Sequence, residues 1–227
     1  MKIRNTIIAL AFFVMPQLKA QINFMVGYDQ GFRSLEQIND QISRFNTENA
    51  SVTRKMRPIW SMGGLDLGLK YRIRAVSLEG HYITRFKVSR SQQTIIDEVF
   101  KNDVKLNDQG YNFGLTFNRK KFGFGGSWEN HSFRFSRKFS DDKKFIEAFD
   151  PALRYSTLNF FLDFRFRFSE LVGFHIRPYY QFPLGGGDQI ITSTIATNMK
   201  LNPSAIDNPT TNWRLFGVKF LFANGRQ

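Results

Sequence analysis

The chain contains 227 residues with a mass of 26.5 kDa, enough for one domain or two small ones, which excludes a large multidomain protein. It has no cysteine, so disulfides, zinc–thiolate sites and thiol catalysis are excluded. Aromatic residues make up 16% of the chain, but a mean hydropathy of -0.33 and 22% charged residues argue against a bundle of membrane helices. The formal net charge of +13 would suit a nucleic-acid-binding protein if the basic residues shared one surface.

Residues 1–20 follow the pattern of a cleaved signal peptide. Two basic residues precede an apolar run from Ile7 to Val14, and a small residue closes the segment. The run is much shorter than the roughly 20 residues that a membrane-spanning helix needs. We therefore expect export, cleavage near Ala20-Gln21, and one mature domain over residues 21–227. A buried N-terminal helix is the alternative.

Beyond residue 20 the chain alternates apolar and polar residues with a period of two, which is typical of β-strands with two unlike faces. Eight segments show this alternation, and the apolar face of each lacks charged residues. The intervening positions are mostly polar and carry charges at mid-strand. The apolar faces cover Ile22–Tyr28, Leu65–Ile73, Val76–Val88, Tyr111–Phe117, Phe122–Trp128, Leu158–Phe168, Val172–Phe182 and Phe216–Phe222.

The gaps between these segments alternate in length, at 36, 2, 22, 4, 29, 3 and 33 residues. Such alternation is typical of an even-stranded outer-membrane barrel with long outer loops, short periplasmic turns and both termini in the periplasm. The sequence therefore predicts an all-β fold, an eight-stranded antiparallel up-and-down transmembrane β-barrel. An exported β-sandwich is the alternative. The predicted outer loops are 29–58, 90–108, 136–153 and 183–212.

The two faces of the predicted barrel assign residues to lipid or to the lumen. The lipid-facing aromatic residues would include Phe24, Tyr71, Tyr82, Phe113, Trp128, Phe164, Tyr180 and Phe220. The lumen would hold a polar network of Asp66, Lys70, Arg72, Glu79, His81, Arg85, Lys87, Asp163, Arg165, Arg167, His175, Arg177 and Lys219. Because an eight-stranded barrel has room only for side chains or one small ligand, we expect these groups to pair and to fill it.

The predicted network contains eight cations and three carboxylates, so positive charge is in surplus. This surplus leaves open a narrow, anion-preferring passage for small solutes. Nucleic acid is not expected as a partner, because these basic residues line an interior.

The last predicted strand, Trp213 to Phe222, is aromatic and resembles the assembly signal of outer-membrane barrels. With the strand pattern and the Ala20-Gln21 junction, it makes the chain similar to the small eight-stranded barrels of the OmpA, OmpX and OmpW type. Within these, the chain resembles the PorT-like outer membrane β-barrel group of Bacteroidota. It departs from many members by continuing past the last aromatic residue to Gln227. The resemblance implies an envelope location and an accessory role in protein secretion, and it transfers no binding or catalytic motif.

Two groups of polar residues allow metal-binding or catalytic interpretations. His81, His131 and His175 all fall in the polar phase, and three imidazoles can hold zinc, but we expect them to join lumenal hydrogen bonds. Glu129, His131 and Ser132 lie close in sequence, as in a lipid-modifying enzyme with a serine nucleophile. Adjacent strand residues face opposite ways, so we expect no catalytic site, no cofactor and no enzyme activity.

The predicted loops carry two further signals. Apolar residues three or four apart between Leu35 and Phe45, including Ile38 and Ile42, predict a short amphipathic helix. The loop 183–212 has three consecutive glycines without a following phosphate-binding motif, so we expect a mobile surface loop.

The strands and their short turns carry two signals of their own. Pro178 cannot donate a ladder hydrogen bond, which predicts a bulge or a strand end. The basic turn Arg119 to Lys121 would lie with Arg74 near the anionic phospholipids of the periplasmic leaflet, or would simply be solvated.

These features together predict a structural or interaction role in the outer membrane. The protein would serve envelope integrity or act as an accessory to a larger complex, with its lumen filled by side chains. The expected partners are outer-membrane lipids, lipopolysaccharide and a protein bound through the outer loops. An anion-preferring pore and a lipid-modifying enzyme are the alternatives.

Overall fold

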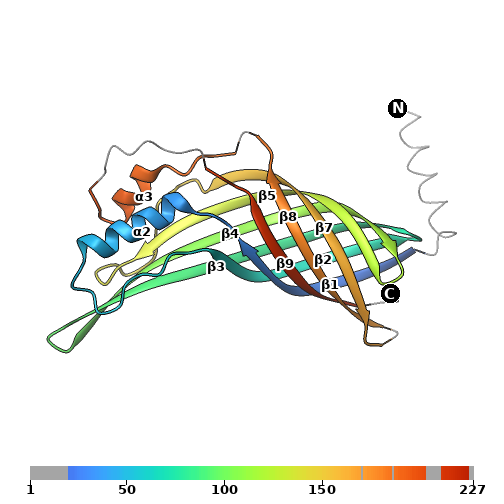
Figure 1. Ribbon diagram of the computed structural model, residues 1–227, viewed down its shortest axis with the longest axis horizontal. Coiled ribbons are helices and arrows are strands. Elements are labelled where there is room, and N and C mark those ends of the chain that lie inside the picture. The colour runs from blue at the N-terminus through green and yellow to red at the C-terminus, as the bar shows by residue number, and fades with distance from the viewer. Residues whose placement is uncertain (1–19, 170, 186, 203–210, 225–227) are drawn as a thin grey trace.

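The computed structural model describes residues 20–169, 171–185, 187–202 and 211–224, so the signal peptide predicted for residues 1–20 lies almost entirely outside the described residues. The described chain consists mainly of antiparallel strands with two helices at one end (Figure 1). The strands are β1 (Ala20–Phe32), β2 (Ser61–Ile73), β3 (Val76–Ile95), β4 (Glu98–Arg119), β5 (Phe122–Lys138), β6 (Ile146–Glu147), β7 (Leu153–Arg167), β8 (Val172–Pro183) and β9 (Leu215–Asn224). The helices are α2 (Glu36–Glu48) and α3 (Thr192–Asn198).

Eight of these strands close into a barrel. Each pairs antiparallel with the next along the chain, except that the two-residue strand β6 only adds to the edge of β5, and β5 pairs directly with β7. The ring closes where β1 pairs with β9, from Met25↔Ala223 to Phe32↔Phe216. Closure leaves no free sheet edge, which is what a hydrocarbon environment requires. The predicted eight-stranded antiparallel barrel is confirmed.

The register of the ladders sorts side chains into two populations. Within the lipid band, the outward residues of all eight barrel strands are mostly apolar and exposed, as at Phe24 (64%) and Phe113 (63%). Their inward neighbours are buried and mostly polar, as at Asn23 and Asn112. Exposing so many aromatic side chains to water is energetically unfavourable, whereas contact with lipid acyl chains is favourable. The outer wall of the barrel is therefore a lipid-facing surface.

Strands β3, β4 and β5 continue well beyond the barrel rim. The β3–β4 ladder runs without interruption to Ile95↔Glu98, and its hairpin projects past the helices (Figure 1). The prediction of an outer loop over 90–108 was therefore wrong. These residues lie outside the lipid, where the outward face no longer has to be apolar, and the alternating signal disappears although the strand does not.

The remaining outer segments fold over this extension as a cap, defined as residues 33–60, 139–152 and 187–202 with the projecting parts of β3, β4 and β5. The predicted amphipathic helix is confirmed as α2, with Leu35, Ile38, Ile42 and Phe45 buried. The loop predicted as mobile contains α3, whose Ile195 is buried in the same core. The cap core comprises Leu35, Ile38, Ile42, Phe45, Met56, Ile59, Met62, Val104, Leu106, Phe133, Phe135, Phe139, Phe149, Leu153, Tyr155, Ile190, Ile195, Ala196, Met199, Leu201 and Trp213.

Two asparagines of α2 hold the returning chain against the helix. The Asn39 side chain accepts from the Ile59 amide at 2.7 Å and donates to the Ile59 carbonyl at 3.1 Å. The Asn46 side chain makes the same reciprocal pair with Met56, at 2.9 Å for both bonds. In the first outer segment, the returning chain at Met56 and Ile59 is therefore fixed against helix α2.

Pro178 interrupts one ladder without adding a residue. The β7–β8 register stays constant from Phe161↔Tyr179 to Phe164↔Ile176, but the two pairs between them are not made. The other side of β8 pairs through Pro178↔Val218. The predicted bulge or strand end is thus wrong: the strand continues, and the missing proline N–H leaves a local gap in the hydrogen-bond ladder.

Candidate functional site

The lumen contains a continuous network of buried charged groups. Arg85 organises the part of this network that is nearest the cap. This arginine projects from β3 and is completely buried. Its Nη2 lies 2.8 Å from Asp29 on β1, and its Nη1 lies 3.2 Å from Asp108 on β4. Nη2 also donates to the Tyr179 hydroxyl on β8 at 3.1 Å, and that hydroxyl donates to Asp29 at 2.7 Å. One guanidinium therefore ties four strands together across the bore.

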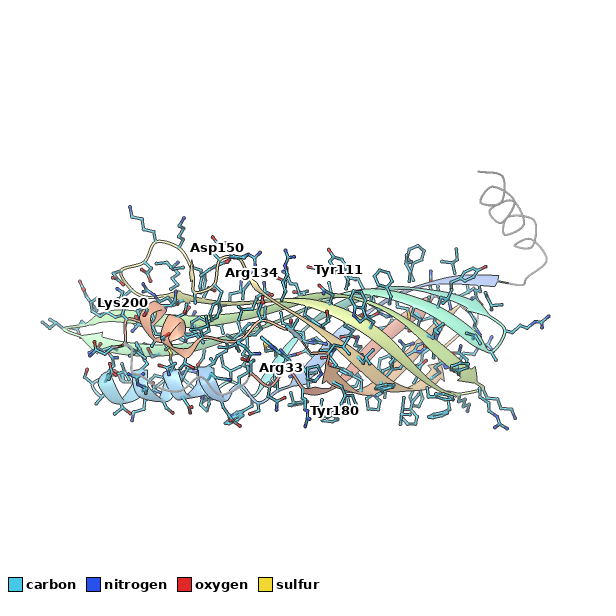
Figure 2. All side chains as sticks on the ribbon, turned by 90° about the horizontal axis from the view of Figure 1, so that it is seen from above. Arg33, Tyr111, Arg134, Asp150, Tyr180 and Lys200 are labelled. Atoms are coloured by element: carbon cyan, nitrogen blue, oxygen red, sulfur yellow. The ribbon has the colours of Figure 1, made fainter. Side chains whose placement is uncertain are left out.

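The junction between lumen and cap is closed by a stack of flat side chains. The rings of His131 and Tyr155 stack at 4.7 Å between centroids, and those of Tyr155 and Trp213 at 4.1 Å. The Arg33 guanidinium lies 4.9 Å from the Tyr155 ring and donates to its hydroxyl at 2.7 Å. Figure 2 shows Arg33 where the cap meets the barrel. The Tyr155 hydroxyl donates in turn to Asp108 at 2.8 Å, which joins this stack to the lumen network.

Histidines connect the middle of the network. His131 bridges Asp108 at 3.2 Å and Glu129 at 3.0 Å through its two ring nitrogens. His81 bridges Asp66 at 2.5 Å and Glu79 at 3.5 Å in the same manner. Lys219 on β9 links the two groups, at 2.9 Å from Asp66 and 3.9 Å from Glu129. Gln181 also donates to Glu129.

Arg177 organises the part of the lumen that is farther from the cap. Its guanidinium lies 2.5 Å from Glu79 on β3 and 3.0 Å from Asp163 on β7. Lys70 on β2 shares both carboxylates, at 2.9 Å from Glu79 and 3.6 Å from Asp163. His175 pairs with Asp163 at 2.8 Å. Side chains far apart in sequence thus meet in pairs across the bore.

The buried charges of the barrel balance. Among the described residues of the lumen network, six buried carboxylates (Asp29, Asp66, Glu79, Asp108, Glu129 and Asp163) face five buried cations of the barrel strands (Lys70, Arg85, Arg165, Arg177 and Lys219) and Arg33, which enters from the cap. The seventh buried cation of the described residues, Arg137, pairs with Asp142 in the cap at 2.8 Å. The cation surplus expected from the sequence is therefore not found in the buried network. Only charges that are matched and hydrogen-bonded in this way can be buried at moderate cost.

Three predicted members of the lumen network lie outside it. Lys87 is exposed because β2 pairs with β3 only as far as Phe86, so the wall beside Lys87 is missing. Arg72 and Arg167 lie at the opposite end of the barrel, where each donates to a turn carbonyl, at 3.1 Å and 3.2 Å respectively. The remaining predicted residues, Asp66, Lys70, Glu79, His81, Arg85, Asp163, Arg165, His175, Arg177 and Lys219, are buried as expected.

Sequence reasoning missed the carboxylates that supply the balance. Asp29 and Asp108 were placed in outer loops, and Glu129 just beyond the end of a strand. All three lie in the inward phase of their strands. Asp29 and Glu129 each lie one residue past the last predicted lipid-facing aromatic, whereas Asp108 lies three residues before Tyr111. Extending each alternation by a single inward position would have found Asp29 after Tyr28 and Glu129 after Trp128. No comparable signal marks Asp108.

Little space remains inside this network. A cavity of about 10 Å³ lies among Glu79, Asn112, Asn159, Arg177 and Lys219, together with the residues beside them. That volume is close to the minimum needed for one water molecule. A solute could cross the lumen only if the cross-bore ion pairs separated.

The metal and catalytic interpretations find no matching geometry. The three histidines each contact different carboxylates, and no group of three or more metal-ligating residues occurs within the described residues. His131 is buried in the lumen, whereas Ser132 is on the opposite, outward face and is partly exposed. The nucleophile and base of the candidate enzyme therefore do not meet.

The lipid face matches the residues assigned to it. Phe24, Phe113, Trp128, Phe164, Tyr180 and Phe220 are exposed, and Tyr71 and Tyr82 are partly exposed. Neighbouring rings pack along the wall, as for Tyr82 and Tyr111 at 5.2 Å between centroids. None of the helices within the described ranges is long and apolar enough to cross a membrane.

The ladder closure, the lipid-facing wall and the paired lumen define a transmembrane β-barrel with a filled interior. No protein-family model and no curated protein matches the chain. Solved structures with a similar shape include the attachment invasion locus protein Ail of Yersinia pestis in complex with the heparin analogue sucrose octasulfate, at 11% identity and a TM-score of 0.46, covering 92% of this chain and 100% of Ail. Neisserial surface protein A matches at 10% identity and a TM-score of 0.42, covering 91% of this chain and 98% of that chain. OprG of Pseudomonas aeruginosa matches at 10% identity and a TM-score of 0.38, covering 90% and 95%. The assignment to the barrel class rests on this chain's own strand pairing.

Proposed function

We propose that the protein is a sealed outer-membrane barrel that presents a rigid cap to the outside of the cell as an interaction surface. The observation that carries this proposal is the cap's own hydrophobic core, which continues through Tyr155 and Trp213 into the charged lumen. A pore would need the bore to be open and its loops to leave it free. Here ion pairs fill the lumen, and the packed cap covers its outer end.

The connections at the two ends support an orientation with the cap outside the cell. Long folded excursions occupy the cap end, and two-residue turns such as Arg74-Ala75 and Lys120-Lys121 occupy the other, which we call the turn end. Outer-membrane barrels place the short turns in the periplasm. The export pattern of residues 1–20 supports this location. Membership in the PorT-like group, with an accessory role in secretion, is the finer proposal and rests on the sequence resemblance alone.

The cap offers two surfaces for the proposed partners. The tip of the β3–β4 hairpin exposes Ile96 (93%) at a backbone φ of 46°, a conformation that a β-branched residue adopts only with strain. An apolar side chain held there is suited to contact with a protein. Just above the lipid band, the exposed cation Arg154 is suited to the phosphates of lipopolysaccharide, whereas Arg134 is already paired with Glu147 at 3.0 Å (Figure 2 labels Arg134).

The proposal includes no catalytic step and no conducted solute. Ser132 and His131 lie on opposite faces, and the charges of the lumen balance, so neither alternative gains a specific observation.

Conductance in planar bilayers tests the seal. We expect the purified protein to be silent in salt gradients of either direction. A variant with Arg85→Ala and Arg177→Ala removes both cross-bore guanidiniums and should conduct, which establishes that inserted protein is detected. Steady anion-selective currents from the unaltered protein would refute the proposal.

Shortening the hairpin tests the interaction role. Replacing residues 93–100 with Asn-Gly keeps a two-residue turn and removes no member of the cap core. We expect this variant to fold and to reach the outer membrane but to fail in complementing a strain that lacks the protein. Full complementation would show that the tip is not the contact surface.

A further inference from the structure

Uncompensated positive charge gathers at the turn end of the barrel. The sequence places a single carboxylate, Glu170, in the stretches that form its three turns. Six cations lie in or beside these turns: Arg72, Arg74, Arg119, Lys120, Lys121 and Arg167. All but Arg72 are exposed, and Arg72 is partly buried. The lumen cations, by contrast, face carboxylates in equal number. The turn end is therefore the strongly charged surface that the filled barrel does not explain.

Two of these cations occupy unfavourable backbone positions. Arg74 and Lys120 each begin a two-residue turn with a positive φ, of 54° and 48° respectively. Glycine and asparagine adopt this conformation more readily than long side chains do. An asparagine side chain at either position would also be well hydrated. Solvation alone thus gives no reason for a basic residue at either position, whereas a requirement for charge does.

The aromatic residues beside the turns fix the depth of these cations in the membrane. Phe117 and Phe124 stack at 5.3 Å between centroids, and Phe122 packs on Phe164 at 5.6 Å. Arg119 follows Phe117 by two residues, and Lys121 immediately precedes Phe122. At about 3.3 Å per strand residue, these charges lie within about 7 Å of the last lipid-facing rings. That is the level of phospholipid headgroups next to an aromatic belt.

We propose that the turn end binds the phosphates of anionic phospholipids in the leaflet that it faces. This inference rests on the membrane orientation given in the proposed function. Guanidinium groups pair with phosphate oxygens bidentately, and several cations around one rim can hold more than one headgroup. The ring of phenylalanines favours a lipid over an acidic protein segment, because it places the cations in the plane of the headgroups.

Native mass spectrometry of the full-length barrel in mild detergent measures the lipid preference directly. Phosphatidylglycerol and phosphatidylcholine are added in equal amounts to the unaltered protein and to a variant with Arg74→Asn, Arg119→Gln, Lys120→Asn and Lys121→Gln. Each cation near an anionic surface contributes about fivefold to binding, so the variant, which lacks four of them, should lose its preference for phosphatidylglycerol by about six hundredfold. The preference of the unaltered protein should weaken as salt is raised.

A matched variant at the other end controls for net charge. Lys55→Gln, Lys101→Gln, Lys143→Gln and Lys144→Gln remove the same number of exposed cations from the cap. We expect this variant to retain the preference for phosphatidylglycerol. Equal loss in both variants, or no loss in the turn-end variant, would overturn the proposal.

Folding and the seal are followed separately. Asparagine suits the positive φ of both turns, so the turn-end variant should keep its heat-modifiable mobility and remain electrically silent. Currents from the unaltered protein would refute the sealed barrel whatever the lipid result. If the unaltered protein shows no lipid preference but binds polyglutamate, and the turn-end variant does not, the site is a protein-docking surface and the lipid assignment fails.

Discussion

Replacing Arg177 with methionine tests whether the lumen is dry and held by its ion pairs. The Arg177 guanidinium reaches Glu79 at 2.5 and 3.1 Å and Asp163 at 3.0 and 3.2 Å, and the side chain is 3% exposed. Methionine keeps much of the apolar volume that packs on Phe161 but removes the charge. Both carboxylates would then share Lys70, and Asp163 would also keep Arg165 at 3.5 Å.

The size of the effect follows from burial. Removing one partner of a buried ion pair leaves an uncompensated charge and costs about 3–5 kcal/mol of unfolding free energy. The double variant Arg177→Met with Glu79→Gln removes one charge of each sign, so the barrel stays balanced. We therefore expect its loss to be smaller than the sum of the two single losses by about 2 kcal/mol.

Reversible unfolding by urea in phosphatidylcholine vesicles, followed by tryptophan fluorescence, gives the free energies. Arg167→Met provides the matched control, since Arg167 is exposed on the neighbouring strand and its loss should change stability by no more than about 0.5 kcal/mol. A cost below about 1 kcal/mol for Arg177→Met, with additive single effects, would mean that water screens the lumen charges. The sealed-lumen explanation would then be refuted.

Three further substitutions address the cap, the wall and the seam between strands. Ile42→Ala, in the cap core, should cost about 2–4 kcal/mol and open the cap to limited proteolysis while the heat-modifiable shift of the barrel persists. Phe160→Arg, on the lipid face, should reduce folding stability in vesicles by about 2–4 kcal/mol if it lies near the bilayer midplane, and by nothing if water wets that face. Gly64→Ala should destabilise the barrel by about 1–3 kcal/mol, because its Cβ would meet the Thr84 carbonyl oxygen at 1.7 Å. Gly80→Ala, whose nearest neighbour would lie at 3.5 Å, should be neutral in the same urea titration, and equal effects would contradict the close approach of β2 and β3.

The local sequence determined the barrel wall because lipid imposes a strict rule on every outward position. From Ile22 to Tyr28 and from Leu158 to Phe168, each second residue must tolerate acyl chains, so the strand, its phase and its apolar face can all be read from a period of two. The alternation of long and short gaps then sets the up-and-down order. The amphipathic spacing from Leu35 to Phe45 similarly predicted α2 before any partner was known.

Only the tertiary structure decided what the inward residues do and how far the strands continue. Beyond the lipid band an outward residue is free to be polar, so the pattern ends at Val88 although β3 continues to Ile95. Pairing in the lumen depends on the heights of side chains across the bore, which are set by the register of strands far apart in sequence. Arg177 meets Glu79 across 98 positions of sequence. Lys87 is not in its predicted place because the pairing of β2 with β3 ends at Gly63↔Phe86, one residue before it, and no property of Lys87 itself records where that pairing ends.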